Sequence, residues 1–410
     1  MKKIFPVFLF LLTGFSSCKK TGSLVEAPLN NENPVSSERI NQTIPNDGTY
    51  SNFVGEDLDI DFNYSIIGDP GYGTPGAERS GAAYIYNRAV NSNAWSKVMT
   101  IKHANGKYND NFGFEVAIDG DNAVSCTNDS LYAFKRLPSG KWVQRQVFLP
   151  PHLPAQGISV SAIDIDGDHM IIGHASRPYN SEWGTGAIYF YKLENNLWVY
   201  KSTFLSPNAS GHDWFGIAVS MHGNYALVGA RGDRASDSDN PPPGSHGGKA
   251  YVYIRTGDTW TRQATIVPPD IVTGDLFGEH LELYENFAAI GASQDGRGSN
   301  VNKLGKVYIY RRSGTTWTRD VGIMAPDYMA NGRFGRGIAI NKNYLVVGGG
   351  SYDGALYFFN RFGLSFYYLR TETSPLSNPN AFGAKLAMDS TQHYLVGQNG
   401  LGSFHFGTVY

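Results

Sequence analysis

This 410-residue chain is poor in cysteine and carries little excess charge. Its two cysteines, Cys18 and Cys126, cannot supply the several disulfides that hold small secreted folds together, so stability must come from a large core. The net charge of −2, with lysines and arginines scattered along the chain, excludes the basic face typical of nucleic-acid binders. The apolar run at residues 4–15 is shorter than the roughly 20 residues of a membrane-spanning helix.

Common catalytic motifs are also missing. The ten histidines show neither the His-x-His nor the His-Glu-x-x-His spacing of metal sites, and the sequence contains no Gly-x-Ser-x-Gly elbow and no phosphate-binding loop. No nucleophile, base and orienting group can be assembled from spacing. The sequence therefore favours a non-catalytic protein, without excluding an enzyme.

The N-terminus has the pattern of an export signal. Lys2 and Lys3 precede the apolar run, and the small residues Ser16 and Ser17 stand just before Cys18. This pattern resembles a bacterial lipoprotein signal, which implies that residues 1–17 are removed and that Cys18 is acylated. The alternative is a plain secretory signal followed by an incidental cysteine.

Residues 18–38 are rich in Ser, Asn, Glu, Thr and Pro and have few large apolar side chains. Such a composition cannot bury enough surface to offset the entropy of ordering, so we interpret the segment as a flexible tether. Lys19 and Lys20 follow the cysteine where an Asp would act as a retention signal. By resemblance to Gram-negative sorting rules, this predicts a lipid anchor in the outer membrane.

The rest of the chain is a repeat. Phe-Gly recurs at intervals, with two degenerate copies at residues 53–55 and 157–158, which gives seven units of about 55 residues each. The five full copies are Phe112-Gly113, Phe215-Gly216, Phe277-Gly278, Phe334-Gly335 and Phe382-Gly383.

Each unit has the pattern of four short strands. In the fourth unit we expect strands at residues 216–221, 225–230, 249–255 and 260–264, separated by Gly-rich turns and one long polar loop. The third strand is rich in tyrosine, and a tryptophan opens the fourth in most units. Repeated antiparallel meanders of this kind predict a β-propeller, with the large rings packed between neighbouring blades.

These units resemble FG-GAP repeats, the units of integrin α-like propellers. The resemblance implies an all-β, seven-bladed propeller of four-stranded antiparallel blades over residues 39–410. The last unit ends after its third strand, which would leave an open edge. We therefore predict that residues 39–44 complete the seventh blade and close the ring.

Calcium is the cofactor that this resemblance suggests, because integrin-type repeats hold it in an Asp-rich loop. Calcium needs about six to eight oxygen ligands, whereas most of the corresponding turns here are short and suit tight hairpins. Ca²⁺ is therefore possible but not favoured. The best candidate metal ligands are Asp164, Asp166 and Asp168 in one turn, and Asp233, Asp237 and Asp239 in a loop that could equally be a solvated surface segment.

One face of the propeller should carry the long loops, since second-to-third-strand loops and blade-to-blade loops fall on the same side. Long loops on a rigid frame commonly bind ligands. The candidate ligand-binding residues are Arg177, Tyr179, Glu182, Trp183, Trp214, Arg234 and Arg297.

Aromatic rings beside charged groups suit stacking on sugars or anchoring a protein. We therefore predict a binding or adhesion module of the cell envelope, with an extracellular or periplasmic protein or glycan as its partner and no nucleic acid. The alternatives are a structural subunit of an envelope complex and a glycan-active enzyme that uses the same face.

Overall fold

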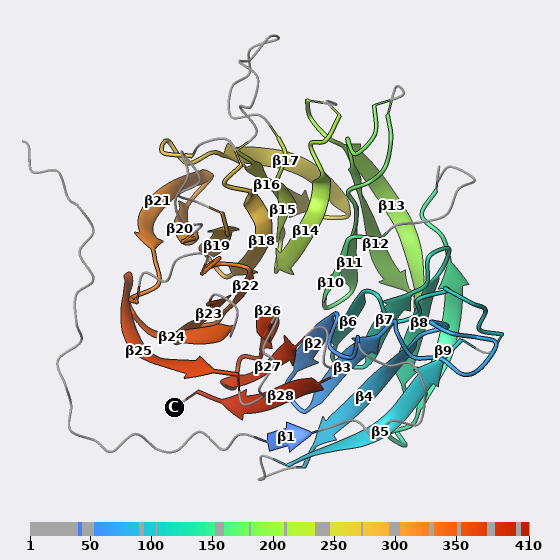
Figure 1. Ribbon diagram of the computed structural model, residues 1–410. Helices are drawn as coiled ribbons and strands as arrows, with labels where there is room; N and C mark the ends of the chain where they lie inside the picture. The colour runs from blue at the N-terminus through green and yellow to red at the C-terminus, as the bar shows by residue number, and fades with distance from the viewer. Residues whose placement is uncertain are drawn as a thin grey trace, which may run out of the picture.

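The chain folds into seven four-stranded antiparallel sheets arranged in a ring (Figure 1). The computed structural model describes residues 40–42, 53–89, 94–103, 105–151, 160–179, 182–208, 211–233, 247–271, 274–294, 304–327, 332–350, 354–374, 382–398 and 403–409. These residues contain strands, turns and bends and no helix, so none of them forms a membrane-spanning helix. The predicted all-β, seven-bladed propeller is confirmed.

Each blade is a meander that runs outward from the centre of the ring. The innermost strands are β2 (Leu58–Asp61), β6 (Val116–Asp119), β10 (Ala162–Asp166), β14 (Phe215–His222), β18 (Phe277–Tyr284), β22 (Gly337–Ile340) and β26 (Phe382–Met388). The second strands are β3 (Tyr64–Asp69), β7 (Asn122–Cys126), β11 (His169–His174), β15 (Tyr225–Ala230), β19 (Phe287–Ala292), β23 (Tyr344–Gly349) and β27 (His393–Gln398). The third strands are β4 (Ala82–Arg88), β8 (Leu131–Arg136), β12 (Ala187–Glu194), β16 (Lys249–Thr256), β20 (Lys306–Ser313), β24 (Ala355–Phe362) and β28 (Ser403–Thr408). The outermost strands of blades 1 to 6 are β5 (Trp95–Lys102), β9 (Trp142–Phe148), β13 (Leu197–Leu205), β17 (Thr259–Ile266), β21 (Thr316–Ile323) and β25 (Ser365–Thr373).

Blade 7 is completed from the other end of the chain, as predicted. Its outermost strand is β1 (Ile40–Gln42), which pairs with β28 through Ile40 and Phe406 (Figure 1). Blades 7 and 1 also meet at Gly397 and Gly55, where a Cβ added to Gly397 would lie 2.4 Å from the Gly55 carbonyl oxygen. The degenerate first copy of the repeat therefore makes the same inter-blade contact as the full copies.

The Phe-Gly pair exists because neighbouring blades meet there. Gly216 has a φ of 87°, a conformation that favours glycine. Its carbonyl oxygen lies against Gly173 of the preceding blade, and a Cβ on Gly173 would sit 2.0 Å from that oxygen. Gly68 meets the Gly113 carbonyl in the same way, at 1.9 Å. Backbone contact between blades thus requires glycine on both sides.

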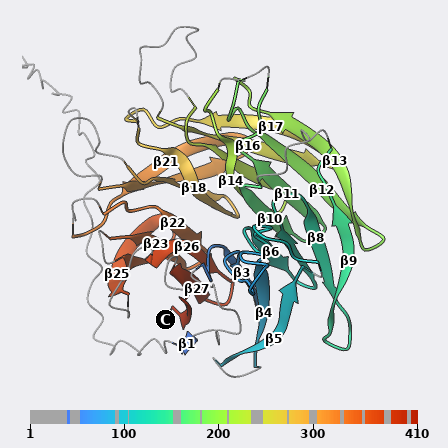
Figure 2. The same cartoon turned by 45° about the vertical axis from the view of Figure 1, so that its right-hand side comes forward.

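Large rings fill the space between blades, as the sequence predicted. Trp95 of blade 1 stacks on Phe406 of blade 7, with ring centroids 4.4 Å apart. Trp260 of blade 4 stacks on Phe190 of blade 3 at 4.2 Å. Figure 2 shows the same radial arrangement from a second direction. The tryptophan that opens the outermost strand is therefore a structural residue.

Candidate functional site

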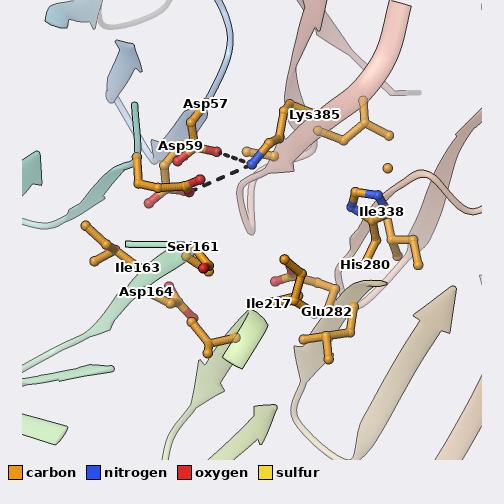
Figure 3. A pocket seen from close by; sticks show the side chains of 18 of the residues that line it. Asp57, Asp59, Ser161, Ile163, Asp164, Ile217, His280, Glu282, Ile338 and Lys385 are labelled. Carbon is orange, nitrogen blue, oxygen red and sulfur yellow. Dashed lines mark hydrogen bonds and ion pairs between the residues drawn. The ribbon is translucent and has the colours of Figure 1, made fainter. Parts of the chain in front are cut away.

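A cavity of about 560 Å³ lies at the centre of the ring. All seven innermost strands contribute side chains to its wall, and Figure 3 shows residues from several of them around it. Ser176, Trp214 and Arg231 line it at the long-loop end. The cavity and the long-loop face predicted to bind ligand are therefore continuous.

Acidic side chains line much of this cavity, and several of them hold neighbouring blades together. Asp59 accepts a 2.8 Å hydrogen bond from the backbone N–H of Ile118 in blade 2. Asp164 accepts one of 2.5 Å from Met221 in blade 4. Innermost strands of adjacent blades belong to different sheets, so these N–H groups need a side-chain acceptor. Asp57, Asp61, Asp119 and Asp166 make the equivalent contact.

Burial perturbs the ionisation of the acids in the cavity. It raises the pKa of Asp59 to about 7, against the lowering effect of its two backbone hydrogen bonds. It raises the pKa of Glu282 to about 8, with Asp59 adding to the effect. Glu282 has a weak partner, the Ser220 hydroxyl at 3.4 Å. Loss of solvation disfavours the charged form, so near neutral pH Glu282 is largely a neutral acid.

The basic side chains of Lys385 and His280 also face the cavity (Figure 3). Lys385 lies 3.0 Å from Asp57 and 3.8 Å from Glu115, and although burial opposes its charge, these carboxylates raise its pKa. Burial lowers the pKa of His280 to about 4, so this imidazole is neutral at pH 7. Together with Arg231, the cavity wall therefore holds two paired cations, a neutral histidine and several acids.

The predicted metal ligands in blade 3 are engaged in other contacts. Asp164 and Asp166 accept backbone hydrogen bonds from blade 4, and Asp168 lies 2.5 Å from Nδ1 of His169. Within the described part of the chain, no group of three His, Cys, Asp or Glu residues is placed to hold a metal ion. Calcium binding stays an untested prediction.

Of the second acidic group, Asp233 is described and is fully buried. Its carboxylate accepts hydrogen bonds from Tyr251 and, at 2.8 Å, from Asn208. It also lies 3.5 Å from the Lys249 ammonium. Asp233 is therefore saturated by protein groups. Asp237 and Asp239 lie outside the described residues, as do Arg234, Arg297 and Cys18.

Trp183 and Trp214, predicted to bind ligand, come together on the long-loop face. Their rings meet edge to face, with centroids 4.8 Å apart, and His212 lies 5.9 Å from Trp183. Trp183 is 52% exposed, although it is one of the largest apolar side chains. An exposed tryptophan held in place by a second one is a surface suited to stacking.

Arg231 connects this aromatic pair to blade 5. Its guanidinium carbon lies 5.0 Å from the centroid of the Trp214 ring, and its Nη1 atom lies 2.6 Å from Oε1 of Glu279. Glu279 also accepts a hydrogen bond from Ser293. Burial alone would raise the pKa of Glu279, but nearby groups that include Arg231 lower it. Trp214 is therefore fixed at the cavity entrance by a charged pair.

The other predicted residues lie on the loop between β11 and β12. Tyr179 and Glu182 exchange two backbone hydrogen bonds, which makes a small hairpin with Trp183 beside it. Tyr179 is 37% exposed. The backbone carbonyl of Arg177 accepts hydrogen bonds from Gly186 and Thr185 at the base of this hairpin.

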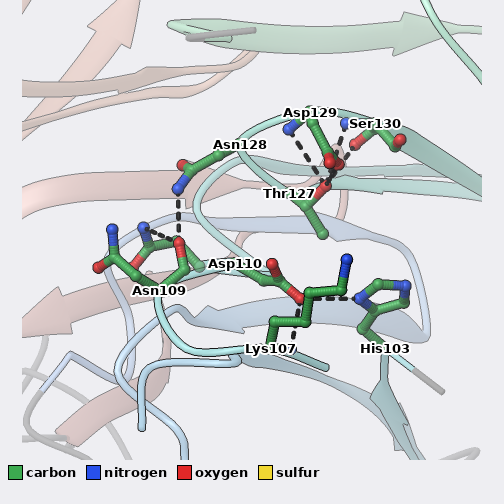
Figure 4. A network of polar contacts seen from close by, with 9 residues as sticks. His103, Lys107, Asn109, Asp110, Thr127, Asn128, Asp129 and Ser130 are labelled. Carbon is green, nitrogen blue, oxygen red and sulfur yellow. Dashed lines mark hydrogen bonds and ion pairs between the residues drawn. The ribbon is translucent and has the colours of Figure 1, made fainter. Parts of the chain in front are cut away.

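The long-loop face of blade 2 is different, because most of its polar groups hydrogen-bond to one another (Figure 4). Asp110 accepts a 2.6 Å hydrogen bond from the Lys107 N–H and lies 3.0 Å from His103. Asn128 donates a 2.6 Å bond to the Asn109 carbonyl. These loops are tied to each other and offer few unused groups to a ligand.

Apart from Asp164, which was a predicted metal ligand, sequence reasoning missed the acids of the cavity. Asp57, Asp59 and Asp61 alternate with apolar residues along one innermost strand, and that alternation was a usable signal once a propeller was expected. His280 and Glu282 alternate with Leu281 and Leu283 in the same way, whereas Glu115 and Lys385 carry no such local pattern. They meet at the centre because the ring brings distant strands together.

Comparison with known proteins supports the repeat assignment. Residues 198–253 and 260–310 match the FG-GAP repeat family. Each match runs from the outermost strand of one blade to the third strand of the next, so the FG-GAP sequence unit is offset from the blade by one strand. No curated protein matches the chain.

The fold is similar to a chain in a crystal structure of a mitotic checkpoint complex. The TM-score is 0.56 at 11% identity, and the alignment covers 99% of both chains. At this identity the similarity extends to the propeller fold alone.

Proposed function

We propose that the protein is a non-catalytic binding module of the cell envelope that takes a protein or glycan ligand on its long-loop face. The observation that supports this most strongly is the exposed Trp183 ring, held against Trp214 at the entrance of the central cavity. A rigid aromatic ring beside Arg231 and Glu279 offers stacking area and directional polar contacts at small entropic cost.

The envelope location rests on the lipoprotein-like N-terminus. Acylation of Cys18 and the tether of residues 18–38 would display the propeller at the outer membrane surface. The loop face of blades 3 to 5 would then meet ligands outside the lipid.

The experiment measures binding of the protein to immobilised cellulose, chitin, xylan and polygalacturonate, both as a purified chain and on cells. We expect Trp183→Ala to weaken binding roughly 5- to 150-fold in both formats, since loss of one stacking ring removes roughly 1–3 kcal/mol. We expect Cys18→Ser to leave purified binding unchanged and to remove binding by cells.

The matched control is Phe362→Ala, which removes another exposed aromatic ring. Phe362 is 78% exposed at the end of β24, beside the turn to β25 and on the face opposite the long loops. Equal losses for Trp183→Ala and Phe362→Ala, or no loss for either, would contradict the proposed face.

A glycan-active enzyme is the second candidate, favoured by the raised pKa values of Glu282 and Asp59 in one cavity. A neutral acid beside a carboxylate is the pairing that glycoside cleavage needs. We rank it second because Asp59 is committed to two backbone hydrogen bonds. Release of reducing ends from the same polysaccharides, lost in Glu282→Gln, would reverse this order.

A further inference from the structure

A buried tyrosine recurs on the third strand of the blades, and in three of them its hydroxyl donates a hydrogen bond to a carboxylate. In blade 1, Tyr84 donates a 3.0 Å hydrogen bond to Asp69. In blade 6, Tyr357 donates one of 2.9 Å to Asp327. In blade 4, Tyr251 donates to Asp233, which Asn208 and Lys249 also approach. In blades 1, 4 and 6, an aspartate beneath the long loops therefore accepts a hydrogen bond from the tyrosine of the third strand.

Blade 3 keeps the tyrosine and changes the partner. In blade 1, Asp69 pairs with Ala82, two residues before Tyr84. In blade 3, His174 pairs with Ala187, two residues before Tyr189, so His174 stands where blade 1 has its aspartate.

A second basic residue stands where blade 4 has its carboxylate. Arg177 is four residues after Gly173, as Asp233 is four residues after Gly229. Two side chains that donate hydrogen bonds have thus replaced two acceptors at equivalent positions.

The result is three buried polar atoms without a partner among the described residues. They are the Tyr189 hydroxyl, Nδ1 of His174 and Nη1 of Arg177. Tyr189 is fully buried and His174 is 3% exposed. Unpaired buried polar groups of this kind cost about 1–3 kcal/mol each, so three at one place are unusual.

The charge of Arg177 influences the pKa values of both His174 and Tyr189. Burial, with a smaller contribution from the charge of Arg177, lowers the pKa of His174 to about 4. Burial raises the pKa of Tyr189, while Arg177 opposes that rise. His174 is therefore neutral at pH 7, and the guanidinium charge beside it has no carboxylate among the described partners. Residues 152–159 and 180–181, the parts of blade 3 outside the described residues, contain no Asp or Glu.

We propose that blade 3 binds the carboxylate of an acidic sugar, with Arg177, His174 and Tyr189 as donors in place of the missing aspartate. The loop that carries Arg177 also carries Trp183, which would stack on the sugar ring. This inference rests on the proposed function, because it names the ligand class of the same face.

The test compares polygalacturonate with its fully methyl-esterified form, which has the same polymer backbone and no free carboxylates. We expect the wild-type protein to bind the acid at least tenfold more tightly than the ester, as one charge-assisted pair provides. His174→Asp restores the blade 1 arrangement, so it should raise the melting temperature. It should also bring the ratio of the affinity for polygalacturonate to the affinity for the ester close to one. Arg177→Gln, at a half-buried position, should also remove the preference.

The outcomes separate the two proposals. The carboxylate site is overturned if the wild-type protein binds the acid and the ester equally, or if its preference for the acid survives in both His174→Asp and Arg177→Gln. A buried water would then be the partner of these donors. Equal binding to polyglutamate overturns the sugar assignment. If Trp183→Ala reduces binding to both polymers while His174→Asp removes the preference alone, both proposals stand. If His174→Asp acts and Trp183→Ala does not, the proposed face fails and the carboxylate site stands.

Discussion

Blades 1 and 3 share their backbone and differ in the chemistry beneath their long loops. Gly68 and Gly173 each abut the Phe-Gly carbonyl of the next blade at almost the same distance. Tyr84 and Tyr189 occupy the same register position on their third strands. Blade 1 supplies a carboxylate to its tyrosine, whereas blade 3 supplies His174.

The comparison shows that the frame and the site are specified separately. Backbone contacts and buried rings hold each blade in place, so a change of side chain under a loop leaves the architecture intact. A similar difference appears on the loop face, where most polar groups of the blade 2 loops pair with one another, whereas His174, Arg177 and Tyr189 of blade 3 each have a buried atom without a described partner. A blade with unmet hydrogen-bonding capacity is the one that can accept a ligand.

The largest expected effect tests the shared frame. Gly68→Ala and Gly173→Ala each push a methyl group into a carbonyl oxygen of the next blade, which costs about 3 kcal/mol in the free energy of unfolding. Urea unfolding of both variants measures it. Equal losses show that the two blades use one frame, and a difference above about 1 kcal/mol would contradict that equivalence.

The next prediction compares the loss of the hydroxyl group at Tyr84 of blade 1 and at Tyr189 of blade 3. Tyr84→Phe removes one hydrogen-bond donor from the buried Asp69 and should cost about 2 kcal/mol. Tyr189→Phe removes a hydroxyl that has no described partner, so stability should be unchanged or slightly higher. Urea unfolding without added ligand gives both values. Similar losses in the two variants would break the contrast between blades 1 and 3.

A pH-dependent effect concerns the same kind of contrast on the innermost strands. Asp59 has two backbone donors, whereas Glu282 has one distant hydroxyl. Burial raises the folded-state pKa of Glu282 from 4.5 to about 8, so the folded state binds more protons than the unfolded state between these values. Its contribution to stability is therefore present at low pH and is lost as pH rises through about 8.

Glu282→Gln has no charge to bury, so it should be more stable than wild type at pH 8, with the difference shrinking towards pH 5. Urea unfolding at pH 5, 6.5 and 8 provides the measurement. Parallel pH profiles for the two proteins would show that Glu282 is solvated like a surface acid.

Much of the architecture was predictable from the sequence. The spacing of Phe-Gly located the blades, and the strands expected in the fourth unit agree with β14 to β17 within a few residues. Ring closure by residues 39–44 followed from a missing strand. Of the candidate site, the sequence identified Trp183 and Trp214 because they fall outside the repeat, and it identified Arg177 by its loop. It did not identify His174 or Tyr189, which belong to regular strands.

The sequence by itself determined the repeat, the number of blades and the loops that vary, because alternation, turns and glycines act over a few residues. The tertiary structure decided which groups meet. The seven innermost strands converge on one axis, so acids far apart in the chain share a cavity and raise one another's pKa. The partner of each buried tyrosine likewise depends on strand register and burial, and these are set only when the blades pack together.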